Sequence, residues 1–161
     1  MSDPAAPWAD PWAEPRYYMG VTPRRVYAYC LDLVIVGLLW LVAFLAGVLV
    51  GALTLGLLWP VVVAALGVVP LAYHTLTIAG PRSATIGMRI AGVRVMSLTA
   101  ADGKPGLVQA LLQTVGFYAS LALTGSLILL VALFNPRRRT LHDLLAGTVV
   151  VNDPAGWRGA P

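Results

Sequence analysis

Residues 33–81 contain no Asp, Glu, Lys or Arg, a run of 49 consecutive uncharged positions. One helical crossing of a bilayer takes about 20 apolar residues, so this run predicts two helices joined by a turn. Gly51 and Gly56 favour a tight turn in the middle of the run. We therefore expect a transmembrane hairpin with helices near 25–50 and 56–80.

The composition agrees with a membrane protein and excludes several other classes. Of the 161 residues, 58% are hydrophobic and 11% are charged, whereas an average soluble domain has roughly 25% charged residues. So small a chain has too much surface to bury this many apolar side chains in one core. Cys30 is the single cysteine, so an internal disulfide is excluded.

The basic residues indicate membrane orientation rather than nucleic-acid binding. The net charge is +4, and all eleven basic residues lie outside the long apolar runs. They form no basic stripe with interleaved aromatic residues, so we expect no nucleic-acid partner. Walker, zinc-protease and Gly-x-Ser-x-Gly motifs are absent from the sequence. The sequence thus predicts a protein that is not an enzyme and has no cofactor or metal.

The chain divides into a membrane domain at 24–152 and two tails. Residues 1–23 contain five prolines and a repeated Pro-Trp-Ala-acid-Pro unit around Trp8 and Trp12. This tail is interpreted as disordered, or alternatively as resting the rings of Trp8, Trp12, Tyr17 and Tyr18 in the lipid headgroup zone. Residues 153–161 are predicted to be disordered.

A second uncharged run, 105–136, has 32 residues, too many for one span and too few for two. The flanks at 1–25, 82–104 and 137–139 are basic, which places all three in the cytoplasm by the positive-inside rule. We therefore expect this run to return as a re-entrant or interfacial hairpin; the alternative is a third ordinary span. A returning hairpin would let 93–97 and 148–151 pair as cytoplasmic strands.

Asp32 is the one charged residue placed well inside an apolar run. It follows Arg25 by seven residues, about 10 Å deeper on nearly the same helix face. A lone carboxylate in hydrocarbon costs at least ~2.5 kcal/mol, so it needs a partner or a water-filled cavity. His74 is expected at the same depth, where the two side chains would relay protons or bind a cation. The alternative is a structural pairing of Asp32 with Arg25, Arg89 or a helix end.

Two further rows of residues recur at helical spacing. Polar and small side chains form one face of the second run and are expected to turn towards Asp32 or to pack on a helix: Gln109, Gln113, Gly116 and Ser120. Small residues on the first helix would allow a neighbouring helix to approach closely: Ala43, Gly47 and Gly51.

Three motifs in order resemble the RDD family of bacterial membrane proteins, which is named for one arginine and two aspartates. They are Arg25-Val-Tyr-Ala-Tyr-Cys-Leu-Asp32, Thr85-Ile-Gly-Met-Arg89 leading to Gly92-Val-Arg-Val95, and Leu141-His142-Asp143 followed by Gly147-Thr148-Val149-Val150-Val151. The resemblance covers about residues 20–152. It implies that Arg25, Asp32 and Asp143 are the residues of the name, and it carries a suggested role in transport.

The sequence thus predicts an all-α integral membrane protein: a transmembrane helical hairpin, a third membrane-embedded helical segment, and short cytoplasmic strands. We expect a homo-oligomer in the bacterial cell (inner) membrane with a cytoplasmic N-terminus. The first functional hypothesis is transport of an ion or small solute; the alternative is a membrane scaffold or assembly protein. The candidate polar site, functional or structural, consists of Arg25, Asp32, His74, Arg89 and Asp143.

Overall fold

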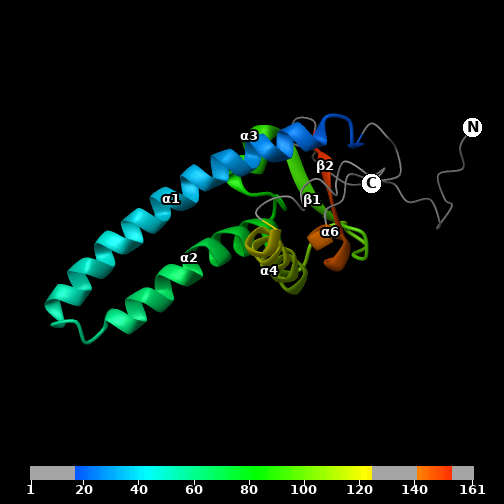
Figure 1. Cartoon of the computed structure of the whole chain (residues 1–161). Helices are drawn as coiled ribbons and strands as arrows, with labels where there is room; N and C mark the ends of the chain where they lie inside the picture. The colour runs from blue at the N-terminus through cyan, green and yellow to red at the C-terminus, as the bar shows by residue number, and fades with distance from the viewer. Residues whose placement is uncertain (1–16, 125–140, 154–161) are drawn as a thin grey trace, which may run out of the picture.

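The computed structural model describes residues 17–124 and 141–153. Its elements follow in the order α1 (Val21–Leu53), α2 (Trp59–Ala79), α3 (Ile86–Ala91), β1 (Val93–Ser97), α4 (Leu107–Thr124), α6 (Leu141–Leu145) and β2 (Thr148–Asn152). Helices α1 and α2 form a long antiparallel arm (Figure 1). The short elements α3, β1, α6 and β2 gather at the base of this arm, and we call them the head; α4 packs against it.

The predicted helical hairpin is confirmed, with α1 longer than expected. The turn lies at 54–58, where Gly56 has a φ of +85°, a left-handed conformation that costs glycine little. α1 begins at Val21, before the expected start of the membrane domain at residue 24. Proline is tolerated in the first helical turn, since an N–H there has no intrahelical acceptor.

The predicted N-terminal tail also ends earlier than expected. Tyr18 is buried against the apolar side chains of Met96, Val149 and Val151, with Tyr17 packed beside it. These two tyrosines therefore pack against the head, so the alternative that placed their rings in the lipid headgroup zone is wrong for them. The prediction for Trp8 and Trp12 lies outside the described residues.

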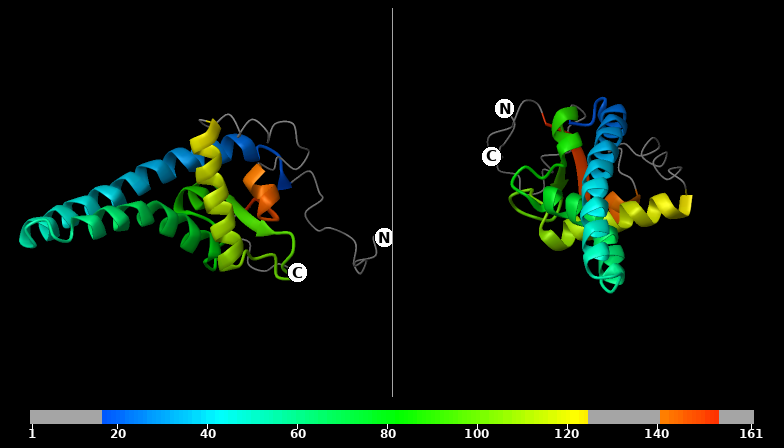
Figure 2. Two further views of the ribbon diagram at one scale, coloured as in Figure 1. Left: turned by 60° about the horizontal axis from the view of Figure 1, so that its bottom comes forward. Right: turned by 90° about the vertical axis from the view of Figure 1, so that its left-hand side faces the viewer.

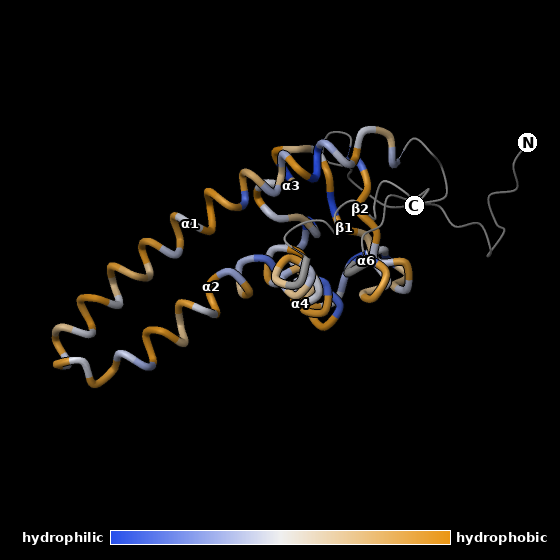
Figure 3. Tube along the Cα trace, in the orientation of Figure 1, coloured by the Kyte–Doolittle hydropathy of each residue, from blue (hydrophilic) through white to orange (hydrophobic). Residues whose placement is uncertain are grey.

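Away from its base, the arm consists mostly of apolar residues (Figure 3). Only 6% of the most apolar stretch of α1 and 22% of that of α2 are buried within the chain. Both helices are long and apolar enough to cross a membrane. The stretch from Leu33 to the end of α1 measures about 31 Å, close to the thickness of a hydrocarbon core.

The small residues of α1 allow α2 to pack closely, as predicted. A Cβ on Gly47 would overlap the Val62 side chain, and one on Gly51 would stand 2.9 Å from the Trp59 ring. Glycine at these positions is therefore required by the close approach of α1 and α2.

Gly47→Ala is expected to destabilise the hairpin by about 1–3 kcal/mol, because the added methyl group overfills the contact with Val62. Gly37→Ala is the matched control: its Cβ would meet open space, so it should stabilise α1 by up to about 1 kcal/mol. Thermal unfolding in detergent micelles measures both effects. Adding Val62→Ala to Gly47→Ala should recover part of the loss; equal effects of the two glycine changes would contradict the packing.

The predicted pairing of two distant strands is confirmed. β1 and β2 are antiparallel, with Val95 opposite Val150. Both valines are fully buried in a core shared with Val21 of α1, Ile78 of α2 and Ala110 of α4. β1 precedes α4 in the sequence and β2 follows residues 125–140. The pairing of the two strands therefore fixes both ends of this intervening segment to one sheet.

The second uncharged run begins with α4, which runs across the arm rather than along it (Figure 2). The apolar part of α4, Leu107–Ala122, is shorter than α1 and α2. The prediction that this run returns as a hairpin depends on residues 125–140, which lie outside the described residues.

Candidate functional site

Asp32 is buried on α1 and accepts three hydrogen bonds from other parts of the chain. The residue is 3% exposed. Its Oδ1 accepts from the Tyr73 hydroxyl at 2.7 Å and from the Gly87 backbone N–H at 2.9 Å. Its Oδ2 accepts from the Thr85 hydroxyl at 2.6 Å. These donors from α2 and from the start of α3 offset the cost of burying the carboxylate.

The same contacts complete the first turn of α3, where a helix leaves its N–H groups without intrahelical acceptors. The Ile86 N–H donates to the Tyr73 hydroxyl at 3.2 Å, the next N–H goes to the carboxylate, and the Met88 N–H donates to the side chain of the N-cap Thr85 at 3.1 Å. With only six residues, α3 is too short to be stable alone. Its contacts with α1 and α2 therefore hold it in place.

Gly87 lets α3 approach α1 closely. A Cβ at this position would overlap the Ala28 carbonyl oxygen and stand 2.8 Å from the Asp32 carboxylate. The glycine of the Thr-x-Gly-Met-Arg motif is therefore required because the two backbones are nearly in contact.

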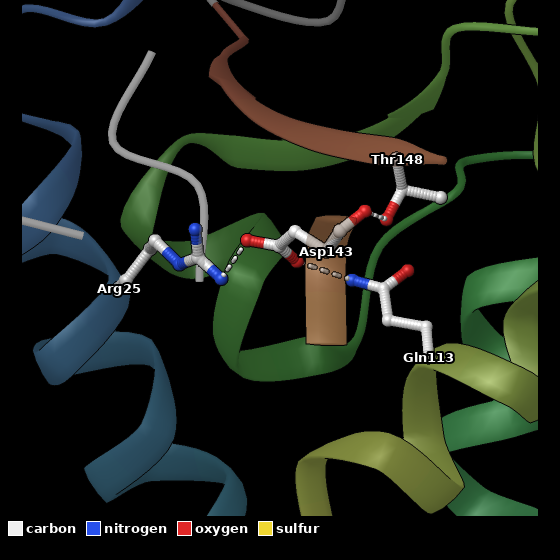
Figure 4. A network of polar contacts seen from close by, with 4 residues as sticks. All are labelled: Arg25, Gln113, Asp143 and Thr148. Carbon is white, nitrogen blue, oxygen red and sulfur yellow. Dashed lines mark hydrogen bonds and ion pairs between the residues drawn. The ribbon is translucent and has the colours of Figure 1, made fainter. Parts of the chain in front are cut away.

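A second buried carboxylate, Asp143, joins α6 to α1 and α4 (Figure 4). Asp143 is 0% exposed, and its Oδ2 lies 2.7 Å from Nη2 of Arg25, whose side chain is 15% exposed. Its Oδ1 accepts from the Gln113 amide at 3.1 Å. The backbone carbonyl of Asp143 accepts from the Thr148 hydroxyl at 3.5 Å, which ties α6 to the start of β2.

Comparison with known proteins identifies the chain by a family profile. The profile of the RDD family matches residues 19–147, which is most of the chain. The chain belongs to the RDD family. No curated protein and no solved structure shows a significant match to it.

Arg25, Asp32 and Asp143, which the resemblance assigned to the family name, occupy two junctions at the base of the hairpin. Arg25 and Asp32 both lie on α1, and each contacts a different part of the head. Asp32 holds α3, which leads directly into β1; Arg25 holds Asp143 of α6, which leads directly into β2. Because β1 and β2 pair with each other, the two junctions fix the sheet to the hairpin from both of its strands.

The structure answers the open question of what Asp32 contacts. The alternative that paired Asp32 with Arg25 is wrong, since Arg25 pairs with Asp143. The pairing with Arg89 is also wrong: its Nε donates to the Ala84 carbonyl oxygen at 3.0 Å. The third alternative, a helix end, is confirmed by the bond from Gly87 at the start of α3.

His74 lies beside the Asp32 cluster but does not bond to the carboxylate. Tyr73, the preceding residue, makes that contact. His74 Nδ1 lies 3.0 Å from the Pro70 carbonyl oxygen and 3.1 Å from the Tyr118 hydroxyl of α4. His74 is thus adjacent in sequence to the residue that meets Asp32, but the expected Asp32–His74 pair is not formed.

The polar face of α4 turns towards the head and meets α6 rather than Asp32. Gln113 bonds to Asp143, and the Gln109 amide donates to the carbonyl oxygens of Ala146 and Gly147 at 2.7 and 3.2 Å. Both glutamines therefore bind the α6–β2 connection.

Sequence reasoning did not identify Tyr73, Thr85 and Gly87 as partners of Asp32. It singled out Gln113, but not its bond to Asp143. Thr85 and Gly87 stood in the motif that resembles the RDD family. A threonine directly before a short helix is also an N-cap signal, and Thr85 is the N-cap of α3. Across residues 17–124 and 141–153, no group of three or more His, Cys, Asp or Glu side chains gathers as metal ligands would. The arrangement joins helices through buried carboxylates with same-chain donors.

Proposed function

We propose that this RDD protein is an integral membrane protein of the bacterial cell membrane, with its hairpin crossing the bilayer and its head on the cytoplasmic side. The nearly unburied apolar arm supports this placement. The exposed basic residues of the described part of the chain lie at the base of the arm or in the segments that follow it, as the positive-inside rule requires of a cytoplasmic face: Arg24, Arg82, Arg89 and Lys104.

Within that membrane we propose a non-catalytic scaffold or assembly role. The observation that carries it is the saturation of both buried aspartates by donors of the same chain. A carboxylate held by several fixed donors is a poor site for a passing ion, because each donor must first lose its acceptor. The aspartates then serve to hold the head rigidly against the membrane-crossing hairpin, where it presents a fixed surface to a partner or to a second copy.

A second candidate function is transport of an ion or small solute, and one buried polar atom without a hydrogen-bond partner among the described residues favours it. The Gln113 carbonyl oxygen, in the same amide that bonds to Asp143, is buried and has no hydrogen-bond partner within the described part of the chain. Buried polar atoms normally find a partner, which includes water or a bound ion.

Flux measurements in liposomes separate the two roles. We expect purified wild-type protein, with trapped pyranine reporting internal pH, to give no flux above protein-free liposomes under imposed proton, Na⁺ or K⁺ gradients. Asp32→Asn should lower the yield of folded protein without changing flux, and Asp102→Asn, at an exposed loop carboxylate, is the matched control. Wild-type flux that Asp32→Asn abolishes at an unchanged folded yield would overturn the scaffold role and establish transport.

A further inference from the structure

The side chains of α4 are arranged with the polar ones inside and the apolar ones outside. The polar face bonds to the head through Gln109 and Gln113. On the opposite side, large apolar side chains are exposed to 40% or more, and we call them the outer face of α4: Leu107, Val108, Leu111, Leu112 and Val115. A helix on a water-facing surface has the reverse pattern, so this face is built for an apolar surrounding.

α4 crosses the arm at its base, level with the Asp32 cluster. The Phe117 ring meets Tyr29 of α1 edge-on, with centroids 5.8 Å apart, and lies 6.2 Å from His74 of α2. The views in Figures 1 and 2 show α4 running across the direction of the two arm helices. If the arm stands in a bilayer, α4 lies along the plane of the membrane.

The strand pairing limits what α4 can do. The chain leaves the sheet at Ser97 and returns to it at Thr148. Everything between these residues must therefore start and finish on the same side of a membrane. A helix lying in the interface meets this condition without crossing.

We propose that α4 is an interfacial helix, with its outer face inserted into the lipid on the same side of the bilayer as the head. The outer face, like the arm, is apolar and exposed. Lys104 is exposed just before α4, where a cation meets anionic headgroups. This inference rests on the proposed membrane position of the hairpin. We expect phospholipid, rather than another protein, to cover this face.

Depth measurements by spin labelling test the proposal. In a Cys30→Ala background, single cysteines replace Val108, Val115 or Ala119, which are exposed along one side of α4. Leu45 serves as the arm reference and Thr99 as the head reference. Labelled proteins in phosphatidylcholine–phosphatidylglycerol vesicles are compared for collision with oxygen, which enriches in lipid, and with a water-soluble nickel chelate.

We expect the three α4 positions to favour oxygen over nickel at one common, shallow depth, with Leu45 deeper and Thr99 exposed to nickel. A steady deepening from 108 to 119, about 16 Å for a perpendicular helix, would overturn the proposal in favour of a crossing. Protection from both reagents would overturn it in favour of a protein partner, including a second copy. Nickel access on α4 with Leu45 in lipid would defeat the interfacial helix alone, whereas nickel access at Leu45 as well would defeat the membrane position of the hairpin.

Discussion

Asp143→Ala is expected to destabilise the protein by about 3–5 kcal/mol, because it leaves the mostly buried Arg25 guanidinium without its counter-ion. The same change removes the acceptor of the Gln113 amide. Loss of the junction frees α6 from α1, so β2 loses one of its supports. Thermal unfolding in detergent, followed by tryptophan fluorescence and size exclusion, measures the loss. Asp102→Ala, at an exposed carboxylate, is the control and should change stability little.

A double variant shows whether the cost comes from the unpaired charge. Replacing both partners with apolar residues, as in Arg25→Met with Asp143→Leu, removes the buried charges together and should recover most of the stability lost in Asp143→Ala. If the double variant is as unstable as the sum of its single variants, Arg25 and Asp143 act independently and the junction is not an ion pair.

The hairpin could be predicted from sequence because composition alone decides it. A run of 49 uncharged residues has few alternatives to two apolar helices. The strand pair could also be predicted, since alternation at Val93–Ser97 and the β-branched run from Thr148 are local signals. The basic flanks added the condition that both strands lie on one side.

The partners of the charged residues could not be predicted, because they are set by tertiary packing. Arg25 and Asp32 share a helix face, but two turns separate them by about 10 Å, too far for an ion pair. Arg25 instead meets Asp143, near the other end of the sequence. Tyr73 and His74 are neighbours in sequence, but their side chains point about 100° apart around α2. The position along the helix could therefore be estimated from the sequence, but not which of the two side chains faces Asp32.

Asp32→Ala is expected to cost about 3 kcal/mol or more, because the hydroxyls of Tyr73 and Thr85 and the N–H of Gly87 all lose their acceptor. Asp32→Asn keeps the shape and one oxygen, so it should lose only part of this, about 1–2 kcal/mol. The expected order of thermal stability is wild type, then Asn, then Ala. Hydrogen exchange should report the loss first at α3.

Thr85→Val provides the matched test of this junction. It removes the Thr85 hydroxyl, one of the three donors to the Asp32 carboxylate, and keeps the side-chain volume nearly unchanged. It also removes the N-cap acceptor of Met88, so it should lie between wild type and Asp32→Ala. When Thr85→Val is combined with Asp32→Ala, the losses should be less than additive, because both changes break the same bond. Strict additivity, or faster exchange in α2 that leaves α3 protected, would contradict the assignment of Asp32 as the residue that holds α3 against the hairpin.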